Sequence, residues 1–300
     1  AVRAFPGVPL VVFIGPPLLL QVAEDIQSGR DAAVADFWDG FRDVAECARG
    51  GRCLLAAESL FRCEQFFYQT GMEIPFLRPM SVWVNATYQP RVPVEGARGE
   101  VLVHSRGRLK YETFFIKGVQ RMAGPEFRFD IVGQEGRIVP FREIAGFHAV
   151  VVLPWSPEIC MLRHLFKMRV PIFVPDRSLL RNLVHVSNRR LLPYPYNLAA
   201  PGSNRSAVAE AHEFDPFLDT ARPAGDMVGL EARAYWAEFS EYLLLPALHR
   251  FAGAAELLAA LHRMRGPAIS AQMRNAYLVD LREARGFWRE SLSRLLAAAA

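Results

Sequence analysis

Hydrophobic residues along the chain form two patterns, short unbroken apolar runs and longer stretches with apolar residues at helical spacing. Between residues 100 and 188 the two patterns alternate, as in parallel strands joined by crossover helices. The expected strands are Val101 to His104, Arg128 to Val132, Ala149 to Leu153 and Val170 to Val174, and the expected helices are Leu109 to Met122, Phe141 to Gly146, Pro157 to Met168 and Arg177 to Leu183. The pattern therefore predicts an α/β fold with a doubly wound domain in this part of the chain.

The chain before residue 100 shows the same alternation with fewer elements. The expected elements are a buried strand at Pro9 to Ile14, a helix at Asp31 to Arg49 that Gly50 and Gly51 end, a strand at Cys53 to Ala57, and a helix from an N-cap at Ser59 to Tyr68 that Gly71 ends. Prolines after this helix restrict their neighbours to extended conformations, so residues 72–99 are expected to be a connector. Because only two strands are clear, this part predicts an incomplete α/β domain.

Beyond residue 190 the alternation stops. Proline, glycine, asparagine and short polar residues dominate residues 191–228, which predicts a long irregular loop. Helical spacing returns at Gly229 to Ala252, with a break at Pro246, then at Ala254 to Met264 and at Ser270 to Leu296. We therefore expect a partial N-terminal domain with a linker (1–99), a Rossmann-like domain with the irregular loop (100–228), and C-terminal helices (229–300).

Composition and charge exclude several classes of protein. The 300 residues are 51% hydrophobic and 22% charged, which is typical of a globular protein large enough for two domains. The formal charge of +4 is a mild excess without a block of like charges, so nucleic acid is not expected as a partner. The apolar stretch Val8 to Leu20 is interrupted by Gly15 and by prolines, and it is shorter than the roughly 20 residues that span a bilayer. We expect no membrane span in this chain.

Cysteines and glycosylation triplets add little by themselves. The four cysteines have neither CxxC nor Cys/His spacing, so no metal site is expected, and we interpret them as mostly buried thiols. The triplets Asn85-Ala86-Thr87 and Asn204-Arg205-Ser206 would matter in a secreted or lumenal protein. Such triplets also arise by chance, so the sequence alone does not assign a role to them.

Candidate ligand-binding residues follow the expected strands, because open parallel sheets bind ligands at the carboxyl ends of their strands. After the strand at Val101 to His104 come Arg106, Gly107, Arg108 and Lys110, which combine three cations with a flexible turn that enters a helix. A diphosphate prefers such a turn, because fixed positive charge and free backbone N–H groups both bind its oxygens. A solvated basic turn is the alternative interpretation.

Two further loops border the same edge of the expected sheet. After the strand at Ala149 to Leu153, Ser156 is placed to cap the next helix and Glu158 lies in its first turn. Glu158 could complement the helix dipole, or it could accept hydrogen bonds from sugar or ribose hydroxyls. After the strand at Arg128 to Val132, the Gly133-Gln134-Glu135-Gly136 turn would let the backbone approach a ligand closely.

The order of these segments resembles the C-terminal half of GT-B glycosyltransferases over about residues 100 to 190. That family has here a hydrophobic strand, a Pro-Ser-like turn, an acid, a helix, and a small residue before a Pro-Val-Ile strand. The matching residues are Leu153 to Glu158 and Val170 to Pro175, with Arg169 in place of the small residue. The resemblance implies a GT-B-like fold of two Rossmann-like doubly wound domains, the first one incomplete, with C-terminal helices.

The resemblance also implies an activity, the transfer of a sugar from a nucleotide-diphosphate donor to an unknown glycan, protein or small-molecule acceptor. It implies no metal and no cofactor, since the nucleotide-sugar is a substrate. It leaves the compartment open between the cytoplasm and the Golgi lumen.

Residue by residue, the resemblance assigns roles in donor binding. It implies that Arg106, Arg108 and Lys110 hold the diphosphate, that Ser156 and Glu158 meet the sugar or the ribose, and that Gly133 and Gln134 border the base. His164 stands where many members have a second acid, and we include it among the donor-binding residues.

Two mechanisms of transfer remain open. Inverting transfer needs a general base that takes the proton of the acceptor, and Glu58, directly after the strand at Cys53 to Ala57, is the candidate, although it could also serve a capping or surface role. Glu158 is the second candidate catalytic residue. Retaining transfer relies on the donor phosphate instead. In both mechanisms the cations stabilise the charge that grows on the departing diphosphate.

Proteins of other classes would also fit these residues. A degenerate GT-B half could be a non-catalytic scaffold or binding protein that packs its aromatic C-terminal helices against a partner. The short first region and His164 at the position of an acid favour that alternative. A sugar-nucleotide epimerase would keep the same fold and change the reaction.

Overall fold

The computed structural model describes residues 8–15, 18–22, 31–93, 95–105, 110–132, 138–154, 159–187, 211–214 and 227–299. The chain divides into two compact units. Unit 1 comprises Ala1–Pro79, Pro193–Arg222 and Leu281–Ala300, and unit 2 comprises Met80–Leu192 and Pro223–Asp280. The expected boundaries were at residues 99 and 228, whereas unit 2 begins at Met80 and the last helix contributes residues to both units.

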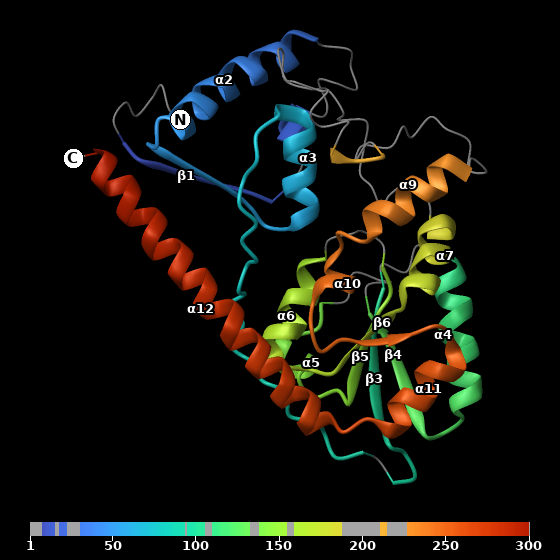
Figure 1. Ribbon diagram of the computed structural model, residues 1–300. Coiled ribbons are helices and arrows are strands. Elements are labelled where there is room, and N and C mark those ends of the chain that lie inside the picture. Colours follow the sequence, from blue (N-terminus) through green and yellow to red (C-terminus); the bar gives the residue numbers. More distant parts are fainter. Residues whose placement is uncertain are drawn as a thin grey trace. The chain divides into compact units, whose positions relative to one another are not determined.

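Unit 2 is built on a five-stranded parallel sheet (Figure 1). Its strands are β3 (Gly99–His104), β4 (Phe127–Val132), β5 (Ala149–Val152), β6 (Ile172–Pro175) and β7 (His249–Phe251). The order across the sheet is β4-β3-β5-β6-β7, so the chain reverses direction across the sheet at β3 and β5, as in doubly wound folds. The predicted α/β class is confirmed, with parallel strands and helices in alternation.

Helices cover both faces of this sheet (Figure 1). On one face, α4 (Lys110–Ala123) and α11 (Ala254–Arg263) pack on a core that includes Val101, Val103 and Phe251. On the other face lie α5 (Phe141–Ile144) and α6 (Cys160–Met168). Unit 2 also contains α7 (Arg177–Ser187), which packs on α9 (Met227–Ala237), and α10 (Glu241–Leu244). Because both faces are covered, every residue of β5 and β6 is buried, as the continuous apolar runs predicted.

Strand β7 corrects the sequence prediction, which placed a helix over Gly229 to Ala252. Helix α9 ends at Ala237, and His249–Phe251 instead pairs with the edge of β6. Phe251 is fully buried, and its ring stacks on that of Phe115 at 6.0 Å between centroids. Three residues are too few for the sequence pattern to distinguish a helix from a strand. Pairing with β6 makes this segment a strand.

The start of α6 also differs from expectation. The helix begins at Cys160, and its N-cap is Ile159, which makes no side-chain capping bond. The helix thus begins three residues after the expected start at Pro157, and both Pro157 and the expected cap Ser156 lie outside the described residues. At the other end Arg169 is the C-cap in the left-handed region, with φ of 63°. A residue with a large side chain rarely adopts that conformation, in which glycine is the most common residue.

Unit 1 has a smaller sheet, the parallel pair β1 (Leu10–Ile14) and β2 (Cys53–Ala57). The pair packs against α2 (Asp31–Arg49) and α3 (Leu60–Thr70), while η1 (Leu18–Val22) is a 3₁₀ turn. The capping of α3 is confirmed, since Ser59 Oγ accepts a hydrogen bond from the N–H of Arg62 and Gly71 ends the helix with φ of 67°. Burial alternates along β1, with Val11 and Phe13 exposed, so the strand expected to be buried is covered more fully on one face.

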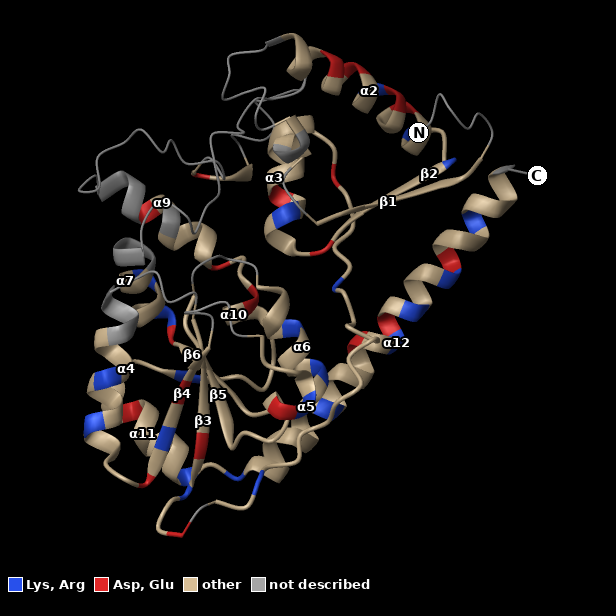
Figure 2. Ribbon diagram, turned by 180° about the vertical axis from the view of Figure 1, so that it is seen from behind, with Lys and Arg blue, Asp and Glu red and all other residues tan. Residues whose placement is uncertain are grey.

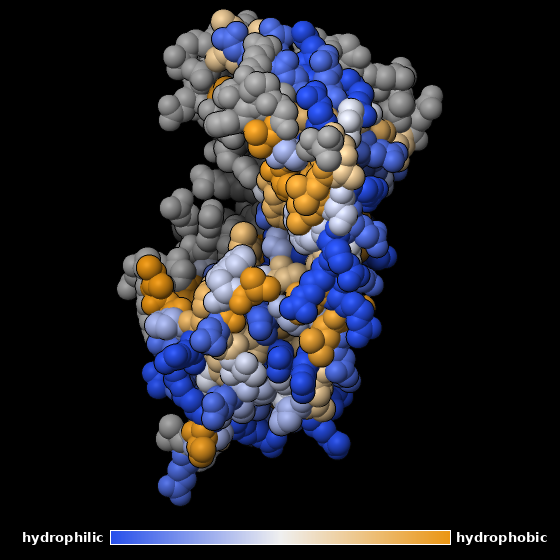
Figure 3. All heavy atoms as spheres, turned by 90° about the vertical axis from the view of Figure 1, so that its left-hand side faces the viewer, coloured by the Kyte–Doolittle hydropathy of each residue, from blue (hydrophilic) through white to orange (hydrophobic). Residues whose placement is uncertain are grey.

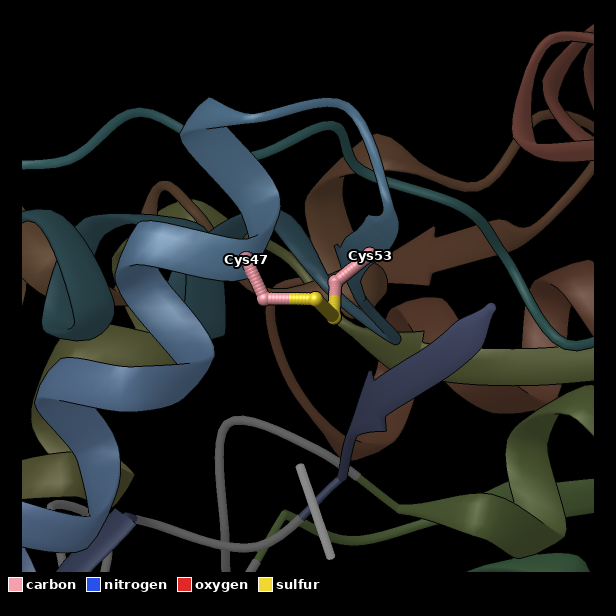
Figure 4. Close-up of a disulfide and its surroundings, with 2 residues drawn as sticks. All are labelled: Cys47 and Cys53. Carbon is pink, nitrogen blue, oxygen red and sulfur yellow. A yellow bond between two sulfur atoms is a disulfide. The ribbon is translucent and has the colours of Figure 1, made fainter. Parts of the chain in front are cut away.

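A disulfide joins α2 to β2 (Figure 4). Cys47 lies in the last turn of α2 and Cys53 is the first residue of β2, and their Cα atoms are 5.2 Å apart. The interpretation of the cysteines as mostly buried thiols is therefore wrong for this pair. A tight turn, in which the N–H of Arg52 donates to the carbonyl of Cys47, brings the two cysteines together. Cys63 and Cys160 lie outside the disulfide, the first buried and the second exposed.

The last helix, α12 (Gly266–Ala299), is 34 residues long and carries acidic and basic residues along its length (Figure 2). Among the described residues no helix is both long and apolar enough to cross a membrane. On the surface drawn in Figure 3, hydrophobic residues occur in patches between hydrophilic ones.

Candidate functional site

A pocket of about 450 Å³ lies in unit 2, on the face of the sheet that α5 and α6 cover. Its lining includes Leu102 and His104 of β3, Val132 of β4, Phe141 of α5, and Met161 and His164 of α6. Among the described residues that line it, His104 and His164 are the ones with polar side chains. The pocket is therefore largely apolar, with the ring of Phe141 and two imidazoles in its lining, and its volume is typical of small-molecule sites.

Strand geometry places the pocket at the carboxyl end of β3. Side chains alternate along a strand, so Val101 and Val103 face α4 and α11 while Leu102 and His104 face the pocket. His104 is the last residue of β3 and is in register with both Val132 and Val152, the last residues of β4 and β5. The pocket thus lies beside the edge of the sheet where parallel folds bind ligands.

His164, a residue predicted from the sequence, lines this pocket. Its ring meets those of Phe141 and Trp83 edge to face, with centroids 5.1 Å and 5.7 Å apart. Burial lowers the pKa of His164, and the neighbouring Arg163 lowers this pKa further. The imidazole is therefore neutral at pH 7, with one nitrogen that donates and one that accepts hydrogen bonds. Such a neutral ring carries no charge, but it can form hydrogen bonds with a hydroxyl group or with the edge of a base.

A buried ion pair fixes α6 next to this ring. The Nε of Arg163 donates to Oε2 of Glu241 at 2.8 Å, and the two side chains are only 4% and 2% exposed. Glu241 is the first residue of α10. Since Arg163 immediately precedes His164, this pair holds the helix that carries His164 against α10.

Glu58 lies in unit 1, where the sequence placed it, directly after β2. Its N–H donates to the carbonyl of Ile14 at 3.0 Å, so it stands at the carboxyl end of the β1–β2 pair. Its carboxyl group lies 3.4 Å from where a Cβ on Gly15 would be. A side chain at position 15 would therefore begin in van der Waals contact with this carboxylate, which is half-buried.

The remaining predicted site residues lie outside the described residues. They are Arg106, Arg108, Gly133, Gln134, Ser156 and Glu158, together with the side chain of Lys110, the first residue of α4. The described neighbours show where their loops begin, because His104 and Val152 at the ends of β3 and β5 are side by side. Sequence reasoning thus predicted His164, and the structure brings it together with His104.

Sequence reasoning missed the aromatic residues of the site. Phe141 was predicted only as part of a short helix, and Trp83 lay in the expected connector. Spacing offered one usable signal, since Met161, His164 and Leu165 share a helix face by the i, i+3, i+4 rule. Within the described residues, no group of three or more His, Cys, Asp or Glu side chains could hold a metal ion.

Comparison with known proteins adds no relative. No protein-family model matches the chain, and neither a curated protein nor a solved structure matches it.

Proposed function

We propose that the chain is a GT-B-like glycosyltransferase that binds a nucleotide-sugar in unit 2, with the nucleobase in the pocket beside β3 and β4. The observation that carries this proposal is the apolar pocket with Phe141 and His164 at the carboxyl end of β3. In sequence, β3 is followed closely by the basic segment Arg106 to Lys110. A GT-B fold for the whole chain is part of the same proposal.

The pocket suits a nucleobase in size and chemistry. A base has two apolar faces and a polar edge, so it prefers a slot with apolar walls and few hydrogen-bonding groups. Leu102, Val132 and Phe141 supply apolar walls, and the neutral His164 supplies a donor and an acceptor. Base stacking on an aromatic side chain is worth about 1–3 kcal/mol, which is enough to favour binding measurably.

The diphosphate would lie on the other side of β3's end. Arg106, Arg108 and Lys110 follow β3 in sequence, and α4 begins at Lys110, so a diphosphate there meets both fixed cations and the N-terminal end of a helix of 14 residues. Ser156 and Glu158 follow β5, the neighbour of β3, and would meet the sugar or the ribose.

Transfer would then form a bond between the sugar and the acceptor and break the bond between the sugar and the diphosphate, which leaves. The cations stabilise the negative charge that the leaving diphosphate gains, a contribution often worth about 3–4 kcal/mol per donor removed. In an inverting reaction Glu58 would take the acceptor proton. The acceptor is a glycan, a protein or a small molecule.

Nucleotide binding tests the proposal directly. Thermal shift and calorimetric titration with UDP, GDP, dTDP, CMP, ADP and their sugar conjugates should give stabilisation by one donor class, because a ligand that binds only the folded state raises its apparent stability. Phe141→Ala should weaken that binding by about 5-fold to 150-fold. Arg106→Ala and Arg108→Ala should weaken it too, but should leave binding of the corresponding nucleoside unchanged.

Matched controls separate binding from folding. Phe114→Ala removes an exposed ring of α4, and Arg128→Ala removes an exposed arginine of β4, and neither residue lines the pocket. Both variants should bind like the unmodified protein. A folded protein that binds none of these nucleotides would contradict the proposal. If a donor binds and is converted in the absence of an acceptor to an epimer, the reaction is epimerisation instead of transfer.

A further inference from the structure

We propose that Asn85 is an N-glycosylation site, so that the chain folds in an oxidising, glycan-adding compartment. This inference rests on residues outside the pocket and stands independently of nucleotide binding. It joins two features that the proposed transfer does not use, the Asn85-Ala86-Thr87 triplet and the Cys47–Cys53 disulfide.

Local structure presents the triplet to solvent. Residues 82–93 lie outside helices and strands, and the segment around the triplet alternates between the protein and solvent. Val84 is 2% exposed, whereas Asn85 and Thr87 are both exposed. In an extended segment residues i and i+2 share a side, so the acceptor amide and the hydroxyl that a glycan transferase must recognise point the same way.

Backbone contacts hold this segment on both sides of the acceptor. The N–H of Val84 donates to the carbonyl of Ser81 at 3.0 Å, and the N–H of Tyr88 donates to the carbonyl of Met168 at 2.7 Å. The hydroxyl of Tyr88 also donates to the carbonyl of His148 at 3.1 Å. A glycan on Asn85 would therefore extend into solvent without displacing a buried side chain or any of these hydrogen bonds.

The disulfide is the independent observation that points to a compartment. Cys47 and Cys53 are both buried and bonded to each other, and disulfides persist in secreted and lumenal proteins but are rare in the reducing cytosol. The same lumenal compartment contains the machinery that modifies Asn-x-Ser/Thr triplets. One exposed triplet and one disulfide in the same chain therefore agree on the same environment.

The modification has a defined chemistry. Nδ2 of Asn85 forms a bond to C1 of the first sugar of a lipid-diphosphate-linked oligosaccharide, and the bond between C1 and the diphosphate oxygen breaks. The amide loses one proton, and the lipid diphosphate leaves. Thr87 supplies the hydroxyl that defines the triplet. The second triplet, at Asn204, lies outside the described residues and takes no part in this argument.

Peptide mass spectrometry of the full-length natural protein, purified from the cells that make it, tests the inference. Treatment with a peptide N-glycosidase should convert Asn85 to Asp, and the untreated peptide should carry the mass of the glycan. A map without reductant should show Cys47 bonded to Cys53. In the same cells, Asn85→Gln and Thr87→Ala should lose the glycan, whereas the matched Thr87→Ser should keep it, because serine preserves the triplet.

The outcomes are distinct. An unmodified Asn85 in the purified protein overturns the proposal, and so does a glycan found on Asn204 alone. A glycan at Asn85 supports it whether or not the protein binds a nucleotide, since Asn85→Gln should leave nucleotide affinity unchanged. Loss of nucleotide binding in that variant, with retained folding, would instead show that the segment belongs to the donor site.

Discussion

The two units are stabilised in different ways, although both start from parallel strands with flanking helices. Unit 2 places five strands between two layers of helices, so its central strands are buried on both faces. Within its described residues, unit 1 has two strands, and one of them exposes alternate residues. Two strands bury too little surface to be stable alone, and unit 1 adds an aromatic cluster around Trp38 and a disulfide.

The larger sheet of unit 2 can accommodate polar groups whose burial reduces stability. Unit 2 buries the Arg163–Glu241 ion pair and leaves an apolar pocket unfilled by its own side chains. Both features cost stability, and a large two-sided core can offset them. In unit 1, a disulfide links helix α2 covalently to strand β2 instead. Three perturbations should affect the stability of the two units differently.

Breaking the ion pair should cause the largest loss, confined to unit 2. Glu241→Leu leaves the guanidinium of Arg163 buried without its carboxylate, and we expect a loss of about 3–5 kcal/mol in the free energy of unfolding. Hydrogen exchange of the β5 and β6 amides, read by mass spectrometry, should report this loss. The double variant Arg163→Met/Glu241→Leu should recover most of it, because no unpaired charge then remains.

An exposed pair provides the control for this prediction. Arg177 and Glu238 are also in contact, at 2.7 Å, but their side chains are 77% and 37% exposed. Glu238→Leu should therefore cost only about 0–1 kcal/mol. Equal losses in the two variants would show that burial does not govern the pair in unit 2.

Removing the disulfide should have an intermediate effect, confined to unit 1. The bond closes a loop with a sequence separation of 6 residues. For so short a loop the chain-entropy relation predicts a stabilisation of about 2 kcal/mol. Cys47→Ala/Cys53→Ala should lose this amount in denaturant unfolding, with faster exchange at β2, whereas Cys160→Ala should not. Faster hydrogen exchange at β5 and β6 in Cys47→Ala/Cys53→Ala would argue against separate stabilisation of the two units.

Acidification should have the smallest effect, and it should act on unit 2. Burial lowers the pKa of His148, His164 and His249 below 6.5, and all three belong to unit 2. As the pH falls below about 6.5, the unfolded chain binds protons that the folded form does not, so the free energy of unfolding decreases. The stabilisation is complete above that pH. Because these side chains are only partly buried, the decrease should be small.

Unfolding midpoints at about pH 7.5 and about pH 5.5, at constant ionic strength, measure this dependence. His164→Phe keeps a ring between Phe141 and Trp83 but removes one titrating group, so it should make the dependence shallower. A dependence that is unchanged in this variant would contradict the contribution of His164.

Much of the fold was predictable because its signals are local. The helix at Asp31 to Arg49 and the strand at Cys53 to Ala57 were predicted residue for residue, and the cap at Ser59 forms as expected. The predicted start of α6 was wrong. Ser156 and Pro157 are residues that favour the beginning of a helix, but α6 begins at Cys160. Strand β7 was missed for a different reason, since three residues contain too little pattern to predict pairing with β6.

The candidate site was predictable only in outline. The carboxyl-end rule directed attention to the loops after β3, β4 and β5, and the family resemblance selected His164. Phe141, Trp83 and His104 come from separate segments, and no spacing within the chain indicates that their rings lie near one pocket. Glu241, the partner of Arg163, is 78 residues away in sequence, so the sequence pattern could not predict this pair either.

The alternation of strands and helices, the capped ends of α3 and the α/β class follow from the sequence alone. They depend on the side chains of a few neighbouring residues. Other features depend on the tertiary fold. They are the order of the strands, the pocket between the sheet and helices α5 and α6, the Arg163–Glu241 pair and the Cys47–Cys53 bond. Each of these depends on the distance between groups after folding. Local preference cannot supply that distance, because it results from burial and packing over the whole unit.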